Sequence, residues 1–291
     1  MTTNVKTIEI PDAVNGYVDL TRHVLEYGNT TSPKGLETKE IEDAVIHIKD
    51  IHNTLPIGIG RGVIPGIGAV EALQIIGGVT APTILLAIAP QFSKYAEPNG
   101  QFHGAYGLRT AGQYDIAIDR LKNDPDTRQA VVTMWNPQLD SVGGKNDYPC
   151  TIMQQFRIRK GKLNMSVYMR SNDVWLGAAY DFFQFTRVQL AIASVLGIEA
   201  GEYAHHVGSL HIYKNNYEDV QKLSYIDKDK YVNVPFISGR SWREVSAVAY
   251  TILQSMSDTK IIQLLNPSEH WYATAMINAI NATRSKETLI S

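Results

Sequence analysis

The chain has 291 residues and 44% hydrophobic content, enough for a sizeable core in one large domain or two small ones. Its formal net charge of −2 argues against a nucleic-acid-binding surface, which needs a clustered basic excess. The lone cysteine excludes an intrachain disulfide and suits a reducing cytoplasm. Residues 1–8 lack the apolar stretch of a secretory signal, and no run approaches the roughly 18 apolar residues of a membrane span. We therefore expect a soluble cytoplasmic protein with neither nucleic acid nor membrane as a partner.

The first fifty residues predict a helix, a loop and a third element of ambiguous type. A helix is expected over residues 19–25, and turn-forming residues predict a loop over 29–35. Residues 46–51 mostly alternate apolar and polar side chains, which favours a strand, although a helix continuing from Glu40 is also compatible with them.

A glycine-rich run covers residues 58–68 and precedes an expected helix over 69–76. Its spacing fits neither the Walker pattern nor the dinucleotide fingerprint, and Pro65 interrupts it. We therefore favour a flexible entry to a packed helix over a phosphate-binding loop of the kind found in NAD-dependent oxidoreductases. Glu71 would lie in the first turn of this helix, where the helix dipole favours a carboxylate in any case.

The centre of the chain predicts a helix over residues 115–123 and a strand over 130–135. Two further strands begin at Thr151 and meet at the turn formed by Lys160 and Gly161. Along the second of these strands, apolar and polar residues alternate, which gives the sheet one apolar and one polar face.

Helical spacing of apolar residues fills 179–196, with Asp181 in the first turn, and again 241–256 and 268–284. We find no internal repeat, linker or low-complexity stretch. The sequence therefore predicts a single domain over residues 1–291.

Most of the chemically active side chains fall within residues 148–213. Cys150 follows a proline at a loop-to-strand junction, and Arg170 lies on the polar face of a following strand. A guanidinium near the thiol would lower its pKa and favour the nucleophilic thiolate, although a lone cysteine is more often a small buried hydrophobe. Arg170 and Ser171 offer a forked donor beside a hydroxyl, which suits a phosphate monoester, and Arg128 could add to them.

Asp181 stands among aromatic residues, so it needs hydrogen-bond partners if it is buried, unless it is only a charge at a helix N-terminus. His211 and Tyr213 share one strand face and suit a sugar hydroxyl, or are satisfied core residues. The neighbours His205 and His206 would point to opposite faces of a strand. Since no ligand set with metal spacing accompanies them, we expect no metal.

These motifs together resemble those of the thymidylate synthase and deoxypyrimidylate hydroxymethylase family. Residues 149–150 are similar to its nucleophile motif, residues 170–177 resemble its R-S-x-D-x-x-L-G signature, and residues 208–213 resemble its G-x-x-H-x-Y. The resemblance covers about residues 69–217. It implies an α+β fold, with a large mixed β-sheet, flanking helices and a back-to-back homodimer.

The resemblance also implies roles for individual residues. Cys150 would add to C6 of the pyrimidine, so that C5 takes a one-carbon unit from 5,10-methylenetetrahydrofolate. Glu71 would manage proton transfers with water, and Tyr106 would help to remove the C5 proton. Asp173 would lie near both base and folate. The implied nucleotide-binding residues are Arg170, Ser171, Asp181, His211, Tyr213, Gln155 and, from the second subunit, Arg128; those implied for the folate are Phe92, Asp173 and Gly177.

The base-reading position carries Asp181, where the synthases of this family have asparagine. An amide both donates to uracil O4 and accepts from N3–H, whereas a carboxylate only accepts and would meet O4 lone pair to lone pair. Cytosine instead offers its N4 amino group, and its N3 gains a proton as the thiol adds. An unpaired buried polar group costs roughly 1–3 kcal/mol, enough for a preference of about tenfold to a hundredfold. Asp181 therefore points to cytosine, and Thr151 after the nucleophile is shared with phage deoxycytidylate hydroxymethylases.

Two other departures favour water as the final reactant. Phe92 stands where a synthase keeps a tryptophan over the folate, and residues 284–291 do not resemble the short apolar segment that closes a synthase site. A less sealed site would let water add to the methylene carbon and give a hydroxymethyl group. Residues 124–128 resemble the family's arginine loop, which reaches across the dimer to the phosphate bound by the other subunit. Gln129 stands where this loop has its second arginine, so Arg61 or Lys34 would assist with the phosphate.

We therefore expect a deoxycytidylate 5-hydroxymethyltransferase that converts dCMP, 5,10-methylenetetrahydrofolate and water into 5-hydroxymethyl-dCMP and tetrahydrofolate. The nearest alternative is a reductive ending, as in a dCMP methyltransferase or a divergent thymidylate synthase, and CMP could replace dCMP. Outside enzymes, the alternative is a catalytically silent nucleotide-binding or mRNA-binding relative, against which Cys150, Glu71, Arg170 and Asp173 argue.

Overall fold

The computed structural model describes residues 6–226, 234–256 and 262–290. Residues 1–5, which form most of the segment in which we expect no secretory signal, lie outside this range, as does Ser291 at the end of the segment 284–291.

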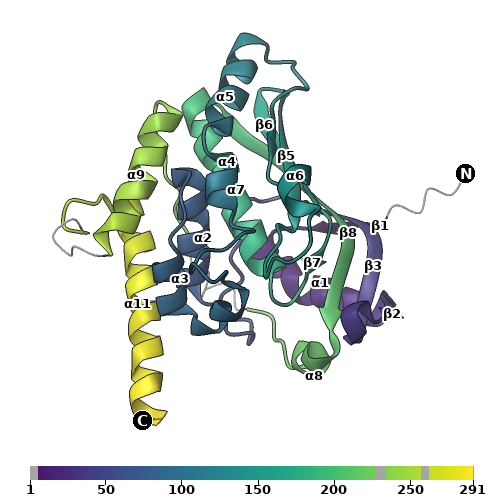
Figure 1. Ribbon diagram of the computed structural model, residues 1–291. Helices are drawn as coiled ribbons and strands as arrows, with labels where there is room; N and C mark the ends of the chain where they lie inside the picture. Colours follow the sequence, from purple (N-terminus) through teal and green to yellow (C-terminus); the bar gives the residue numbers. More distant parts are fainter. Residues whose placement is uncertain (1–5, 227–233, 257–261, 291) are drawn as a thin grey trace, which may run out of the picture.

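One eight-stranded mixed sheet carries the fold (Figure 1). Its order is β1-β3-β8-β6-β5-β4, with β2 paired to β3 and β7 to β8. The pairs β1–β3, β6–β8 and β7–β8 are parallel, and the other pairs are antiparallel. This confirms the predicted α+β class. The strands are β1 (Lys6–Ile10), β2 (Asn29–Thr31), β3 (Thr38–Ile48), β4 (Val131–Thr133), β5 (Thr151–Arg159), β6 (Lys162–Met169), β7 (Asn172–Asp173) and β8 (Glu199–Tyr213).

Helix α7 packs directly on β6 and β8, and α2 lies between α7 and the pair α9 and α11 (Figure 1). The α-helices are α1 (Ala13–Tyr27), α2 (Pro65–Gly77), α3 (Pro82–Ile88), α4 (Tyr106–Thr110), α5 (Gln113–Asn123), α6 (Pro137–Asp140), α7 (Ala178–Leu196), α8 (Tyr217–Gln221), α9 (Trp242–Ser255) and α11 (Pro267–Ile290). Short 3-10 helices are η1 (Pro33–Gly35), η2 (Pro90–Tyr95) and η3 (Lys214–Asn216).

The core forms where α7 meets the sheet, because nearly every residue of this helix is buried. A helix that is apolar on all sides can only be stable between two layers. Its one basic residue, Arg187, is also fully buried and donates to the carbonyl oxygens of Val234 at 2.6 Å and Ile51 at 2.7 Å. These bonds tie two distant loops to the central helix, and they supply acceptors to the two terminal nitrogens of a guanidinium that would be costly to bury alone, while Nε has no partner among the described residues.

Most predicted elements are present, with two corrections. Residues 38–48 form strand β3, so the alternative of a helix continuing from Glu40 is wrong. Helix α2 begins at Pro65, because proline is favourable at the first helical position, and Glu71 consequently lies in its second turn rather than its first. The loop expected over 29–35 contains the short elements β2 and η1.

The alternation predicted for β6 is present. Leu163, Met165 and Val167 are buried towards the helices. On the opposite face of the sheet, the half-exposed ring of Tyr168 stacks on His206 with centroids 4.4 Å apart. The sheet therefore has one face in the core and one polar, half-exposed face.

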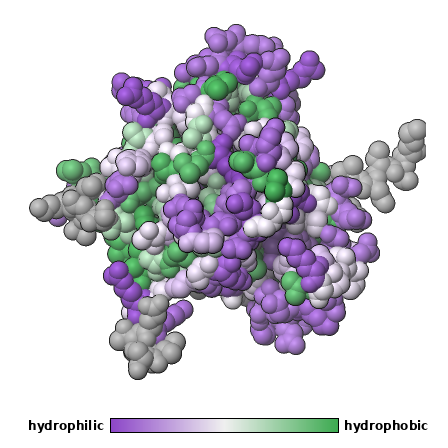
Figure 2. Space-filling view, viewed as in Figure 1, coloured by the Kyte–Doolittle hydropathy of each residue, from purple (hydrophilic) through white to green (hydrophobic). Residues whose placement is uncertain are grey.

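Apolar residues at the surface gather around α2, α3 and α9 in the view of Figure 2, and hydrophilic residues cover most of the remaining visible surface. None of the helices in the described ranges has the length and apolar character needed to cross a membrane.

The packing of α4 on α2 leaves no room for a side chain at Gly107. A Cβ atom there would lie 1.8 Å from the carbonyl oxygen of Val79. We predict that Gly107→Ala lowers the free energy of unfolding by about 3 kcal/mol or more, because the backbone at Gly107 or Val79 must move to make room for the Cβ atom. Urea unfolding followed by circular dichroism measures this change. Gly143→Ala is the matched control, since a Cβ there meets nothing within 4 Å, and equal stability of the two variants would contradict the close approach.

Candidate active site

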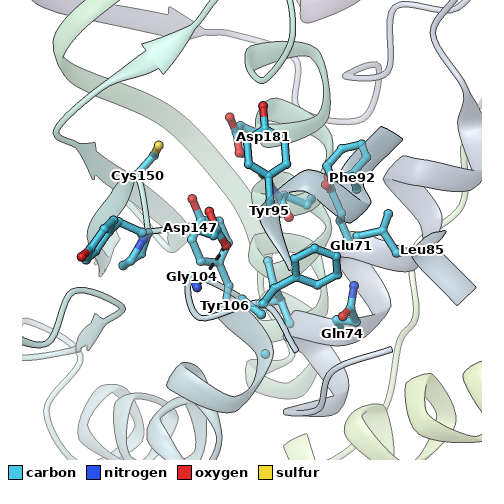
Figure 3. A pocket seen from close by; sticks show the side chains of 17 residues that line it. Glu71, Gln74, Leu85, Phe92, Tyr95, Gly104, Tyr106, Asp147, Cys150 and Asp181 are labelled. Carbon is cyan, nitrogen blue, oxygen red and sulfur yellow. Dashed lines mark hydrogen bonds between the residues drawn. The ribbon is translucent and has the colours of Figure 1, made fainter. Parts of the chain in front are cut away.

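A cavity of about 350 Å³ opens between α2, the start of α7 and the segment that leads into β5 (Figure 3). Three carboxyl groups border it, from Glu71, Asp147 and Asp181, and so does Cys150. Figure 3 shows Cys150 and Asp147 on one side of the cavity and Glu71 and Phe92 on the other. The predicted nucleophile Cys150 and two of the predicted acids, Glu71 and Asp181, thus border one cavity.

Aromatic rings form much of the remaining wall. Phe92 and Tyr95 come from η2, where their ring centroids lie 6.1 Å apart, and Phe102 comes from the loop before α4. Leu85 of α3 extends this apolar surface. Phe92 is therefore in the cavity, as predicted, and the neighbouring rings were not foreseen.

Cys150 immediately precedes β5 and is half-buried. Nη2 of Arg170 lies 3.7 Å from its sulfur, and Nε of the same guanidinium donates to the carbonyl oxygen of Pro149 at 3.1 Å. Burial raises the pKa of the Cys150 thiol to about 11, while Arg170 acts in the opposite direction. The arginine expected beside the cysteine is present, but the prediction of a lowered thiol pKa is wrong, because desolvation outweighs the guanidinium.

Glu71 and Asp181 are the two acids whose pKa values burial brings close to neutrality. Burial raises the pKa of Glu71 to about 8, and the charge of Asp181 adds to the effect. Burial likewise raises the pKa of Asp181 to about 7, against two hydrogen bonds that favour its ionised form. Carboxyl groups poised in this range can take up and release protons at neutral pH.

Asp181 lies in the first turn of α7 and is 7% exposed. Nδ2 of Asn172 donates to its Oδ2 at 2.7 Å, and Nε2 of Gln184 donates to its Oδ1 at 2.7 Å. Both carboxyl oxygens thus accept from amides, as burial of a charge requires. The prediction that a buried Asp181 has partners is confirmed.

Gly177, immediately before α7, makes this arrangement possible. A Cβ atom at Gly177 would lie 2.9 Å from Nδ2 of Asn172 and 3.1 Å from Oδ2 of Asp181. The glycine therefore leaves room for the hydrogen bond between these two residues, and its folate contact stays a prediction.

Tyr106 begins α4 and borders the cavity. Its hydroxyl oxygen accepts from the backbone N–H of Thr151 at 3.2 Å and from the Thr151 hydroxyl at 3.0 Å. Burial raises the pKa of Tyr106 well above its usual value, so the phenol keeps its proton. That proton remains available to a ligand or a water molecule in the cavity, and Thr151 is the residue that orients it.

Asp173 lies in β7, beside His211 of β8. Its Oδ1 accepts from the backbone N–H groups of residues 175–176, whereas Oδ2 is buried with no hydrogen-bond partner among the described residues. His211 Nδ1 lies 3.5 Å from the Ser171 hydroxyl, and its ring meets that of Tyr213 edge-on with centroids 5.2 Å apart. The four predicted residues are neighbours, but none of them borders the cavity that holds Cys150.

Arg128 and Gln155 are not brought to the cavity. The Arg128 side chain is exposed, and its carbonyl oxygen accepts from Nε2 of Gln155 at 3.0 Å. Gln155 pairs with Ser166 across β5 and β6, on the polar face of the sheet, and its Oε1 accepts from Arg157 at 3.0 Å. Within one chain, neither residue lines the cavity that holds Cys150.

Arg61 and Lys34, the two proposed helpers for the phosphate, have different surroundings. Nη2 of Arg61 donates to the carbonyl oxygen of Leu176 at 3.1 Å, and the guanidinium lies over the ring of Tyr180, 5.2 Å from its centroid. Lys34 is exposed in η1. Only Arg61 is held close to the signature segment 170–177.

Several residues around the cavity were missed from the sequence. Asp147 borders the cavity, its Oδ2 accepts from the backbone N–H of Gly104 at 3.0 Å, and burial raises its pKa. Its position three residues before the only cysteine could have drawn attention. Gln184 lies three residues after Asp181, a spacing that places both on one helix face, and could have been found in that way.

His205 and His206 point to opposite faces of β8, as predicted. His205 is fully buried beside Phe182, with ring centroids 5.0 Å apart, while His206 stacks on Tyr168. Within the described residues, no cluster of three or more histidine, cysteine, aspartate or glutamate side chains could hold a metal ion.

The raised thiol pKa gives a direct prediction for Cys150. Iodoacetamide alkylation should speed up about tenfold per pH unit between pH 7 and 9, because only the thiolate reacts. Replacing the neighbouring guanidinium in Arg170→Gln should slow alkylation several-fold at pH 8, since it removes the group that lowers the pKa. Mass spectrometry of the intact protein reads only this site, as the chain has one cysteine. Arg159→Gln is the control, and a rate that levels off below pH 8 would contradict the raised pKa.

Comparisons with known proteins agree with the residues found in the cavity. A family model described as thymidylate synthase matches residues 15–251, which include Glu71, Cys150 and Asp181. The deoxyuridylate hydroxymethyltransferase of Bacillus phage SP01 is 31% identical over 229 residues, covering 71% of this chain. The chain spans only 60% of the length of that relative. With four-fifths of its residues inside the family match, the chain belongs to the thymidylate synthase family.

Proposed function

We propose that the protein transfers a one-carbon unit from 5,10-methylenetetrahydrofolate to C5 of dCMP. One water molecule is consumed, and the products are 5-hydroxymethyl-dCMP and tetrahydrofolate. The observation that carries the proposal is the buried carboxyl group of Asp181, which accepts two amide hydrogen bonds in the cavity of Cys150. Family membership and a hydroxymethyltransferase relative support the one-carbon chemistry.

Cys150 is the nucleophile that adds to C6 of the base. Arg170, 3.7 Å from its sulfur, stabilises the thiolate and binds the 5′-phosphate with Ser171. Glu71, protonated in part at neutral pH because its pKa is near 8, donates and accepts protons at the base. Thr151 donates to the hydroxyl oxygen of Tyr106, so the phenol proton of Tyr106 is free to form a hydrogen bond in the cavity. With this proton, Tyr106 orients the water molecule or basic group that accepts the C5 proton.

Asp181 reads the base. With both oxygens accepting, its ionised form can accept further hydrogen bonds but cannot donate one. Cytosine supplies matching donors at N4 and, once the thiol has added, at N3, whereas uracil O4 would face a carboxylate oxygen. His211 and Tyr213, in edge-on contact on β8, bind the sugar hydroxyl.

The aromatic wall suits the flat pterin ring of the folate. Asp173, which does not border the cavity, has a buried oxygen without a partner among the described residues. Phe92, Tyr95 and Phe102 offer ring faces and edges on one side of the cavity. Bound there, the folate supplies the one-carbon unit at the oxidation level of formaldehyde. Phe92, Asp173 and Gly177 hold it against the base.

A second subunit completes the site. The polar face of the sheet is half-exposed and carries Gln155 and Tyr168, while the Arg128 side chain is solvent-exposed and outside its own chain's cavity. A homodimer joined through this face brings Arg128 of one chain to the nucleotide phosphate of the other. Soluble nucleotide and folate substrates and a single reduced cysteine suit the cytoplasm.

A second candidate reads uracil instead. The relative from Bacillus phage SP01 is named for deoxyuridylate, which favours dUMP as the substrate of this chain also. A protonated Asp181, whose pKa lies near 7, could donate to uracil O4. The two candidates share every step except base recognition.

Product masses test the proposal directly. Purified protein is incubated with 5,10-methylenetetrahydrofolate and, separately, with dCMP, dUMP or CMP, and each product is weighed by mass spectrometry. We expect dCMP to gain CH2O. A gain of CH2 with formation of dihydrofolate would keep the base and overturn the role of water. Turnover of dUMP alone would overturn the proposal that Asp181 selects cytosine. Nucleotide binding without turnover would indicate a catalytically silent member of the family.

Mixed dimers test the role of Arg128. Cys150→Ser and Arg128→Ala should each be inactive alone, because one lacks the nucleophile and the other the phosphate ligand. Co-refolded at equal amounts, they should recover about a quarter of wild-type activity, since half of the dimers are mixed and each holds one complete site. Cys150→Ser refolded alone gives the baseline. No recovery in the mixture would place Arg128 in the site of its own chain, and full activity of Arg128→Ala alone would place it outside the site.

A further inference from the structure

A series of buried hydrogen bonds leads from the centre of β8 to Asp181. The Tyr203 hydroxyl lies 2.8 Å from Nδ1 of His205, and Nε2 of His205 lies 3.1 Å from Oδ1 of Asn172. Nδ2 of Asn172 then donates to Oδ2 of Asp181 at 2.7 Å. All four side chains are at most 7% exposed. The chemistry described above uses only the last of them.

The donors and acceptors of this series are interdependent. Burial lowers the pKa of His205 to about 3, so its ring is neutral, with one donor and one acceptor nitrogen. When the Tyr203 hydroxyl donates to Nδ1, the ring proton is on Nε2 and points to the carbonyl oxygen of Asn172. The amide of Asn172 then turns its NH2 group to Asp181, which accepts as a carboxylate.

The reverse direction has the opposite consequence for Asp181. If Nε2 of His205 accepted from Asn172, the amide would present its oxygen to Asp181. Two oxygens 2.7 Å apart repel unless one carries a proton, so Asp181 would have to be protonated. A protonated carboxyl group both donates and accepts, as the asparagine of a synthase does, and would suit uracil.

One feature favours the first direction. Gln184 donates an amide N–H to the other carboxyl oxygen of Asp181, and two such donors stabilise the ionised form. Gly177 permits the close contact of Asn172 with Asp181 in either direction, since a Cβ there would lie about 3 Å from both polar atoms. The pKa values of Glu71, Tyr106, Cys150 and Tyr203, which all interact with the charge of Asp181, are raised, so these groups are mainly uncharged near pH 7.

We propose that Tyr203, His205 and Asn172 are positioning residues that hold Asp181 as a hydrogen-bond acceptor and thereby set the choice of cytosine over uracil. This inference rests on the proposed function, because it assigns a cause to the base preference of the same site. None of the three residues contacts the reacting atoms. Each acts through the orientation of the next side chain.

The test compares kcat/KM for dCMP and dUMP in the wild type and three variants. Asn172→Asp changes no volume but places a second carboxyl group against Asp181, so the pair must share a proton. The ratio of dCMP to dUMP should fall about tenfold or more. His205→Phe keeps a ring but releases the Asn172 amide to turn, and the ratio should fall several-fold. His206→Phe alters the adjacent histidine on the other face of β8 and should leave the ratio unchanged.

The ratio of kcat/KM for dCMP to that for dUMP distinguishes a loss of positioning of Asp181 from a general loss of packing. A purely structural defect lowers kcat/KM for both nucleotides in proportion and leaves their ratio at the wild-type value, which would overturn the inference while dCMP hydroxymethylation stands. A wild-type preference for dUMP would instead overturn the proposed function, and the inference with it. Should His205→Phe fail to fold, Asn172→Asp decides alone, with far-UV circular dichroism verifying its fold.

Discussion

The burial of carboxyl groups beside a half-buried thiol is the constraint around which this site is built. Asp181 is 7% exposed, and an ionised carboxylate at such a position is unstable without donors. The amides of Asn172 and Gln184 meet that requirement. The balance is close, since desolvation still raises the pKa of Asp181 to about 7 and that of its neighbour Glu71 to about 8. Small changes in hydrogen bonding around Asp181 can therefore change its protonation state.

The fold supplies these groups from four separate segments. Glu71 comes from α2, Tyr106 from α4, Cys150 from the entry to β5 and Asp181 from the start of α7. Close approach of these segments depends on positions without side chains. Gly107 lets α4 contact the backbone at Val79, and Gly177 lets Asn172 reach Asp181. Because the surrounding atoms are closely packed, neither Gly107 nor Gly177 can be replaced by a residue with a methyl side chain without displacing its neighbours.

The thiol illustrates how magnitudes decide between opposing effects. A guanidinium 3.7 Å from sulfur favours the thiolate, but the apolar and aromatic wall that encloses Cys150 disfavours any charge. Desolvation is the larger effect, and the thiol pKa rises to about 11. The same enclosure strengthens every hydrogen bond inside the cavity, because the local dielectric is low. The enclosure of Cys150 thus lowers the fraction of thiolate in the free protein.

Periodicity in the sequence predicted most helices and strands, and the residue pattern drew attention to Cys150 and Asp181, whereas the mixed α+β class and the roles of Glu71 and Tyr106 were implied by the resemblance of short motifs to those of a family. Those features depend on local periodicity and on motifs that are contiguous in the chain. Asp147 was missed although it lies three residues before the only cysteine. The contact of His205 with Asn172 could not be predicted, because it joins residues whose approach depends on strand register. The start of α2 at Pro65, which moves Glu71 to the second turn, was a local signal that we misjudged.

The sequence alone thus determined which chemical groups this protein possesses and that Asp181 differs from an amide. Only the tertiary structure decided what surrounds them. The raised pKa values of Cys150, Glu71 and Asp181 arise from burial by segments far apart in the chain, and no sequence motif encodes the extent of that burial. The hydrogen bonds that orient Asp181 depend on β7 and β8 lying side by side, which places His205 within reach of Asn172.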